Sequence, residues 1–157
     1  SSNISEIQNR YNLKKYILLF PFCSPHLMIK KWPYYNNLIK YISDKFGNKY
    51  QFVTAPGPIE IKAAKDINAT VLLDNGKALD IFQLTSLIKS SSFIIANDTG
   101  PAHICSHMNK HGLVLFGSHT SAHKVSIESE KFKSITVQDL KLLKTETVME
   151  EIKKVLN

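Results

Sequence analysis

The residues that could do chemistry gather in one stretch, S-F-I-I-A-N-D-T-G-P-A-H at 92–103. The apolar run at 93–96 is long enough for a buried strand. Asp98 or Thr99 can cap a helix, and Pro101 suits the first helical turn, where its missing N–H costs nothing. The pattern therefore predicts a strand, a tight turn and the start of a helix.

A turn of this kind can hold an anion. Ligands of open parallel sheets bind at the carboxyl ends of the strands, and the N-terminus of a helix there favours negative charge. The free N–H groups would belong to Thr99, Gly100, Ala102 and His103. A phosphate is the ligand that this arrangement favours. The alternative is a strand-to-helix turn with no ligand, and spacing alone does not separate the two.

The elements that must position this turn alternate along the chain. Strands are predicted at 15–20, 50–54, 69–73, 93–96, 112–116 and, more briefly, 134–137, and helices at 34–46, 59–67, 79–89, 101–109 and 145–156. This alternation is typical of an α/β fold, in which right-handed crossovers build a Rossmann-like parallel sheet with helices on both faces. Residues 1–14 are polar, and we expect a lead-in segment or linker there, followed by one domain at 15–157.

Composition argues against a nucleic-acid-binding, secreted or membrane-spanning protein. The chain has 157 residues and a net charge of +7, but its lysines are scattered and Arg10 is its one arginine. Proteins dedicated to nucleic acid usually cluster their basic residues, so we expect no nucleic-acid partner. Cys23 and Cys105 form no C-x-x-C pair and fit a reducing cytoplasm. The polar N-terminus differs from a signal peptide, and no apolar run reaches the length of a membrane span.

The sequence lacks the motifs of several common phosphate-binding and metal-binding sites. None of the six glycines falls into G-x-G-x-x-G or G-x-x-x-x-G-K-[ST], which excludes the common dinucleotide and P-loop phosphate sites. His103, His107 and His111 lie four apart on a predicted helix, and His119 and His123 repeat the spacing, but no H-E-x-x-H occurs. His111 is expected at a helix C-terminus, where a cation is favoured. We therefore expect no metal.

The order of the motifs resembles glycosyltransferase family 9, the ADP-heptose:lipopolysaccharide heptosyltransferases and their relatives. N-D-T-G-P-A-H-I at 97–104 is followed by L-V-L-F-G at 113–117, and K-K-W-P at 30–33 and G-P-I-E at 57–60 also match. The resemblance runs from about residue 15 to the C-terminus. The family has two Rossmann-like domains, an arrangement called GT-B. This chain resembles only the C-terminal half, which binds the nucleotide sugar.

The resemblance implies roles for particular residues. Lys30 matches a lysine that reaches the donor diphosphate, and its charge would stabilise the leaving nucleoside diphosphate as the catalytic contribution of this half. Glu60 matches an acid that holds the nucleoside ribose. Thr99 and Gly100 match phosphate and sugar contacts. The plainer interpretations are a surface lysine beside Lys31 and a glutamate that stabilises the first turn of its helix.

Three further residues complete the predicted donor site. Ser24, in the loop after the first strand, would offer its hydroxyl to a phosphate. Asp98 would repel a diphosphate, so it is expected to bind sugar hydroxyls or cap the helix. His103 would donate to a phosphate or pack against the preceding strand.

The resemblance thus predicts the donor-binding half of an inverting glycosyltransferase in lipopolysaccharide or related cell-surface glycan synthesis. Its donor would be an ADP-sugar, with no cofactor or metal, and a missing half would bind a lipid-linked or oligosaccharide acceptor. We expect a cytoplasmic location, with peripheral contact at the inner membrane, and no transfer by this half alone. N-K-H-G at 109–112 and S-H-T-S at 118–121 depart from the family pattern. Two alternatives stay open, a non-catalytic nucleotide-binding module and a fragment of a GT-B sugar-nucleotide epimerase that acts on UDP-sugars.

Overall fold

A single parallel sheet organises the chain. The computed structural model describes residues 3–23, 31–117 and 127–157, and within them six strands pair in the order β3-β2-β1-β4-β5-β6, all parallel. The strands are β1 (Tyr16–Phe20), β2 (Gln51–Thr54), β3 (Thr70–Val71), β4 (Phe93–Asn97), β5 (Gly112–Phe116) and β6 (Phe132–Thr136). The predicted Rossmann-like α/β fold is confirmed.

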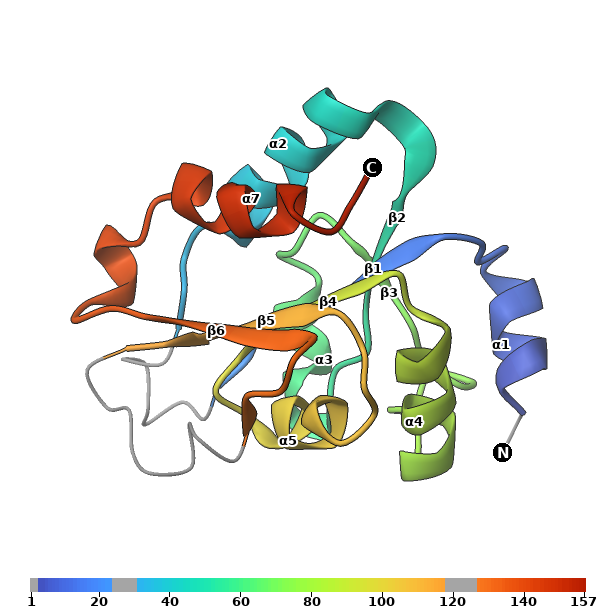
Figure 1. Cartoon of the computed structure of the whole chain (residues 1–157). Helices are drawn as coiled ribbons and strands as arrows, with labels where there is room; N and C mark the ends of the chain where they lie inside the picture. Colours follow the sequence, from blue (N-terminus) through green and yellow to red (C-terminus); the bar gives the residue numbers. More distant parts are fainter. Residues whose placement is uncertain (1–2, 24–30, 118–126) are drawn as a thin grey trace.

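Helices cover both faces of this sheet (Figure 1). The α-helices are α1 (Ile4–Arg10), α2 (Tyr35–Phe46), α3 (Ile61–Ala64), α4 (Ile81–Ser90), α5 (Gly100–Ser106) and α7 (Thr145–Lys153), and short 3-10 turns occur at η2 (Gly47–Lys49), η3 (Pro58–Glu60) and η4 (Leu140–Leu142). In the view of Figure 1, α2 and α7 lie above the sheet and α4 and α5 lie below it.

The central strand shows how the sheet separates two cores. All five residues of β1 are buried. Ile17 and Leu19 contribute to the core beneath α2 and α7, whereas Leu18 and Phe20 contribute to the core above α4 and α5. A strand buried on both faces needs a continuous apolar run rather than alternation, which is why Y-I-L-L-F carries no polar side chain on either side except the Tyr16 hydroxyl.

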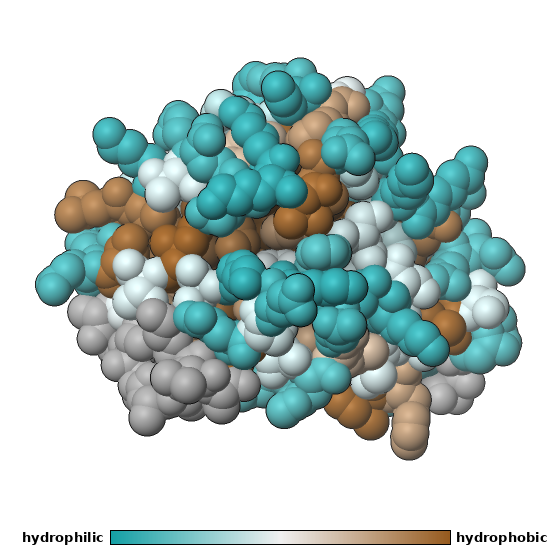
Figure 2. Space-filling model, viewed as in Figure 1, coloured by the Kyte–Doolittle hydropathy of each residue, from teal (hydrophilic) through white to brown (hydrophobic). Residues whose placement is uncertain are grey.

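The surface of the molecule contrasts with these cores. Figure 2 shows hydrophilic side chains over most of the viewed face, with a band of hydrophobic ones between β6 and the helices α2 and α7. Among the described residues, no helix is both long enough and apolar enough to cross a membrane.

Helix α2 begins and ends where the sequence predicts. Trp32 precedes it, is buried, and donates its indole N–H to the carbonyl of Leu143 at 2.9 Å, which ties the start of α2 to the segment before α7. The helix ends at Gly47, whose φ of +61° is a conformation that favours glycine.

Some predicted elements are shorter in the structure. The strand expected at 69–73 is Thr70–Val71, because β3 pairs only with β2 at the edge of the sheet. The helix expected at 59–67 divides into η3 and α3, and the sixth strand covers Phe132–Thr136 rather than 134–137.

The helix after β4 also ends earlier than predicted, and this changes the interpretation of the histidines. Helix α5 stops at Ser106, and Asn109 has a φ of +52° that breaks the helix before β5. His111 therefore lies off the helix that carries His103. The expected row of three histidines on one helix is wrong.

Residues 4–10, expected as a lead-in segment or linker, form helix α1, which Figure 1 shows beside α4. Its Ile7 side chain is buried. Arg10 lies 3.6 Å from a carboxylate oxygen of Asp74, and the Tyr11 hydroxyl donates to the carbonyl of Leu73 at 3.2 Å. These contacts attach α1 to the segment between β3 and α4.

Candidate functional site

The direction in which the strands follow one another reverses between β1 and β4. From β1 the chain builds β2 and β3 to one side, then crosses to β4 on the other. In open α/β sheets such a switch point leaves a crevice at the carboxyl ends of the strands, where ligands bind. The register pairs Phe20 with Ala96, so the segments after β1 and β4 start side by side. The Asn97 side-chain amide donates to the carbonyl of Pro21 at 3.3 Å.

The turn between β4 and α5 carries four of the predicted site residues. Thr99 occupies the cap position, with extended backbone angles, but its side chain makes no capping hydrogen bond. Its hydroxyl oxygen is shielded from solvent and has no hydrogen-bond partner in the part of the chain that the structure describes. A buried hydroxyl without a partner costs free energy, so its position beside the switch point calls for an explanation.

Gly100 opens α5 and is exposed. A Cβ added there would meet no described atom within 4 Å. The fold therefore does not require a glycine at this position for its own packing, and the space in front of the turn is open. Asp98 is buried, and His103 is half-buried in the first turn of α5.

One expected amide donor is occupied within the turn itself. The N–H of Ala102 donates to the carbonyl of Thr99 at 3.1 Å. It is therefore not free for an anion, and the sequence-based expectation was wrong for this group. A tight first turn of this 3-10 type is common at helix ends.

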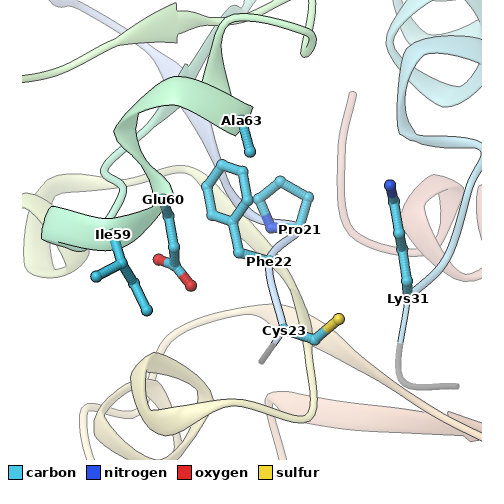
Figure 3. Close-up of a pocket in the computed structure, with 7 residues that line it drawn as sticks. All are labelled: Pro21, Phe22, Cys23, Lys31, Ile59, Glu60 and Ala63. Carbon is cyan, nitrogen blue, oxygen red and sulfur yellow. The ribbon is translucent and has the colours of Figure 1, made fainter. Parts of the chain in front are cut away.

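A cavity of about 210 Å³ lies next to the end of β1 (Figure 3). Apolar side chains form most of its walls, and Glu60 and Lys31 are the two charged residues of the described lining. Its described lining consists of Pro21, Phe22, Cys23, Lys31, Ile59, Glu60 and Ala63.

Glu60 is held in place by the local turn. G-P-I-E forms η3, and the carboxylate oxygen Oε1 of Glu60 accepts the N–H of Gly57 at 2.9 Å. Figure 3 shows the carboxylate between Ile59 and the segment that bears Phe22 and Cys23. A carboxylate has about four acceptor sites, so several remain for a ligand. The helix-start interpretation and the ligand interpretation of Glu60 are compatible.

The structure brings some predicted residues together and leaves others apart. Glu60 lines the cavity, but the described lining does not include Asp98, Thr99, Gly100 or His103. The cavity and the turn are linked through the hydrogen bond from Asn97 to Pro21. Ser24 and Lys30 lie outside the described residues, and Lys31, the neighbour of Lys30, stands on the far side of the cavity from Glu60 (Figure 3).

Sequence reasoning missed several residues at this place. Phe22, Cys23 and Ile59 line the cavity, and Ile59 is 85% exposed although it is apolar. The sequence indicated them only by their positions: Phe22 and Cys23 follow the first buried strand, and Ile59 directly precedes Glu60. A large exposed apolar side chain on a cavity rim is a common feature of ligand sites.

A metal site finds no support in the described residues, among which no three metal-binding side chains gather. His119 and His123 lie outside them. The pKa of His111 is lowered, first by burial and then by the charges of Lys131 and Lys110. A cation is thus disfavoured at His111, contrary to the expectation from its place near a helix end.

Comparison with known proteins settles the family. The sequence model of glycosyltransferase family 9 (heptosyltransferase) matches residues 3–153, which include both the cavity and the turn. The chain belongs to this family. No curated protein sequence matches it.

Solved structures agree with this family 9 assignment at the level of the fold. ADP-heptose lipopolysaccharide heptosyltransferase II of Escherichia coli matches with a TM-score of 0.78 and 22% identity over 97% of this chain and 50% of its own. A heptosyltransferase of the same organism, solved with ADP, matches with a TM-score of 0.71 and 16% identity over 98% of this chain and 48% of its own. The family 9 chain therefore spans about half the length of these proteins.

The fold is shared more widely than the family. UDP-GlcNAc 2-epimerase of Methanocaldococcus jannaschii matches with a TM-score of 0.65 and 14% identity, over 98% of this chain and 43% of its own. This likeness concerns the fold alone.

Proposed function

We propose that this family 9 chain is the C-terminal, donor-binding half of an inverting GT-B glycosyltransferase that takes an ADP-sugar, with a heptose as the sugar. The observation that carries the proposal is the junction at the switch point. There the N-D-T-G turn is hydrogen-bonded through Asn97 to the segment that lines the Glu60 cavity, and its Thr99 hydroxyl has no partner among the described residues.

The cavity suits the nucleoside part of the donor. A nucleobase is flat and largely apolar, and the walls formed by Pro21, Phe22 and Ala63 would cover it. Glu60 would accept hydrogen bonds from the two vicinal ribose hydroxyls through the acceptor sites that Gly57 leaves free.

The turn suits the diphosphate. The Thr99 hydroxyl would donate to a phosphate oxygen, and the open space in front of Gly100 would let the ligand approach the backbone. Lys30 and Ser24 would add a cation and a hydroxyl, and His103 a further donor. Asp98 would contact hydroxyls of the sugar. As the bond to the sugar breaks, negative charge grows on the nucleoside diphosphate, and Lys30 would stabilise it.

The rest of the reaction would come from a second half, corresponding to the part of the related chains that this chain does not cover. That half would bind a lipid-linked or oligosaccharide acceptor and deprotonate the attacking hydroxyl. The chain alone would bind its donor and transfer nothing. Synthesis of lipopolysaccharide or a related glycan would place the protein in the cytoplasm, in peripheral contact with the inner membrane.

The decisive measurement is calorimetry with ADP and 2′-deoxy-ADP on the wild-type chain and on Glu60→Gln. The glutamine keeps an oxygen for the Gly57 N–H but replaces the second acceptor by a donor. We expect the wild type to prefer ADP to 2′-deoxy-ADP by about tenfold, and Glu60→Gln to lose most of that preference, because a hydrogen bond to a charged group contributes about 1.5–3 kcal/mol. Absence of ADP binding by the wild type would contradict the proposal.

The same assay tests the phosphate side. Lys30→Ala is expected to weaken ADP binding more than adenosine binding. Lys31→Ala, which removes the neighbouring lysine, is the variant with which it is compared. Equal losses for both ligands in Lys30→Ala would remove Lys30 from the phosphate site. The epimerase alternative, which rests on the structural likeness to UDP-GlcNAc 2-epimerase, predicts tighter binding of UDP than of ADP.

A further inference from the structure

We propose that Tyr35 and Asn97 act as positioning residues for the donor. With the Pro21 carbonyl they form a buried clamp that holds the N-D-T-G turn against the cavity segment. This inference rests on the proposed function, because the clamp matters only if a ligand bridges the two segments.

The clamp connects three elements that are distant in sequence. The Tyr35 hydroxyl, on the first residue of α2, donates to the side-chain oxygen of Asn97 at 2.7 Å. Asn97, the last residue of β4, donates its amide N–H to the carbonyl of Pro21, the first residue after β1. The Asn97 side chain thus links the end of β4 to α2 and to the segment that follows β1.

A plain packing role does not account for these polar groups. Tyr35 is 2% exposed and Asn97 is fully buried, and the four residues of β4 before Asn97 are all apolar. Burial of polar groups costs free energy unless every donor and acceptor is paired, and an apolar pair of the same shape can be equally stable. A fully paired buried network does, however, fix a single geometry.

The position of the clamp indicates which geometry it fixes. Asn97 is two residues before Thr99, whose hydroxyl has no hydrogen-bond partner in the described part of the chain. Pro21 lines the cavity itself. A shift of either segment would change the distance between the ribose contact and the phosphate contact, and a ligand that spans both would lose one of them.

The protonation and packing of Tyr35 support a fixed orientation. Burial raises the pKa of Tyr35, and the nearby Cys23 thiol raises it further, so the hydroxyl keeps its proton and remains a donor. The Asn97 oxygen must then face Tyr35, which turns its N–H toward Pro21. The Trp32 ring packs edge-on against the Tyr35 ring, with centroids 5.0 Å apart, and restrains it.

The test compares two adjacent tyrosines. Tyr35→Phe removes the clamp hydroxyl and keeps the ring. Tyr34→Phe is the control, because its hydroxyl donates to the Lys141 carbonyl at 2.7 Å and its ring also packs on Trp32. ADP affinity is measured by calorimetry well below the unfolding temperature of each variant. We expect Tyr35→Phe to weaken ADP about fivefold or more, and Tyr34→Phe less than about twofold.

A second variant isolates the other arm of the clamp. Asn97→Asp keeps an acceptor for Tyr35 but, when ionised, cannot donate to the Pro21 carbonyl. We expect a similar loss of ADP affinity, and less than additive losses in the Tyr35→Phe, Asn97→Asp double variant. In the amide NMR spectrum, Gly100 and Cys23 should both shift in Tyr35→Phe and stay in place in Tyr34→Phe.

The outcomes separate this inference from the proposed function. If the wild type binds ADP and Tyr35→Phe binds it equally well, even with a lower unfolding temperature, the hydroxyl is merely structural and the clamp is overturned while the donor site stands. If the wild type binds no ADP, the proposed function falls and the clamp falls with it.

Discussion

Two buried threonine hydroxyls, those of Thr54 and Thr99, differ in whether they have a hydrogen-bond partner. Thr54, at the end of β2, donates its hydroxyl to the Leu19 carbonyl at 2.8 Å, so its polar group is paired within the fold. Thr99, at the end of the turn after β4, has no such partner among the described residues. In both residues the hydroxyl oxygen is buried, but only the Thr54 hydroxyl is paired within the described part of the fold, and the proposed donor site assigns the Thr99 hydroxyl to a ligand.

Valine at each position separates these roles. Thr54→Val should lower the free energy of unfolding by about 1 kcal/mol, because a buried hydrogen bond is lost. Thr99→Val should leave it unchanged or raise it by about 1 kcal/mol, because no bond is lost and an unpaired hydroxyl is removed. Urea unfolding measures both, and calorimetry should show weaker ADP binding in Thr99→Val alone. A clear destabilisation by Thr99→Val would mean that the hydroxyl has a partner in the folded chain.

At the scale of elements, the glycines that start β5 and α5 differ in their surroundings. Gly112 starts β5 between two neighbouring strands, and a Cβ there would lie 2.6 Å from the Ile94 carbonyl oxygen and 2.6 Å from the Phe132 ring. Gly100 starts α5 facing open space. The packing of the sheet requires the first glycine, whereas the packing of the described residues does not require the second.

Substitution of these two glycines by alanine should therefore change the free energy of unfolding by different amounts. Gly112→Ala should cost about 1–3 kcal/mol in the free energy of unfolding, because the backbone of β4 cannot move away without breaking the ladder. Gly100→Ala should change it by less than about 0.5 kcal/mol, since the position is exposed and helical. Denaturant unfolding of both variants measures this. Equal destabilisation by the two substitutions would show that the space before α5 is not open.

At the scale of the whole molecule, the described residues form a sheet that is covered on both faces. Both faces of the sheet have buried cores, beneath α2 and α7 and above α4 and α5. The chain nevertheless covers only about half of the heptosyltransferases that it resembles in fold. Because the proposed donor site lies between elements that contribute to these cores, the proposal predicts that the chain binds ADP by itself.

Binding should thus appear as stabilisation of the isolated chain. A ligand at one hundred times its dissociation constant adds about 2.7 kcal/mol to the free energy of unfolding. For a domain of this size each kcal/mol corresponds to roughly 2–4 °C, so ADP should raise the unfolding midpoint by roughly 5–10 °C. Thermal unfolding with ADP, UDP and inorganic phosphate measures it. A larger shift with UDP would favour the epimerase alternative, and equal shifts with phosphate and ADP would contradict a nucleotide site.

Much of this could be predicted from local sequence. Apolar runs such as Y-I-L-L-F and F-I-I-A, set between amphipathic stretches, are enough to indicate buried strands and covering helices. Errors arose where backbone geometry or the position of a strand in the sheet, rather than the apolar pattern, sets the end of an element. Helix α5 ends at Ser106 although its apolar pattern continues, and β3 shortens because it has a single neighbour.

By itself, the sequence determined the α/β class, the place of the strand–turn–helix at 92–103, and membership of the family through N-D-T-G, L-F-G and G-P-I-E. Each of these depends on residues close together in the chain. Only the tertiary structure decided that β1 lies beside β4, that Asn97 bonds to both Tyr35 and Pro21, and that the Thr99 hydroxyl has no partner within residues 3–23, 31–117 and 127–157. Those facts depend on strand order and on contacts between residues more than sixty positions apart, which no local pattern encodes.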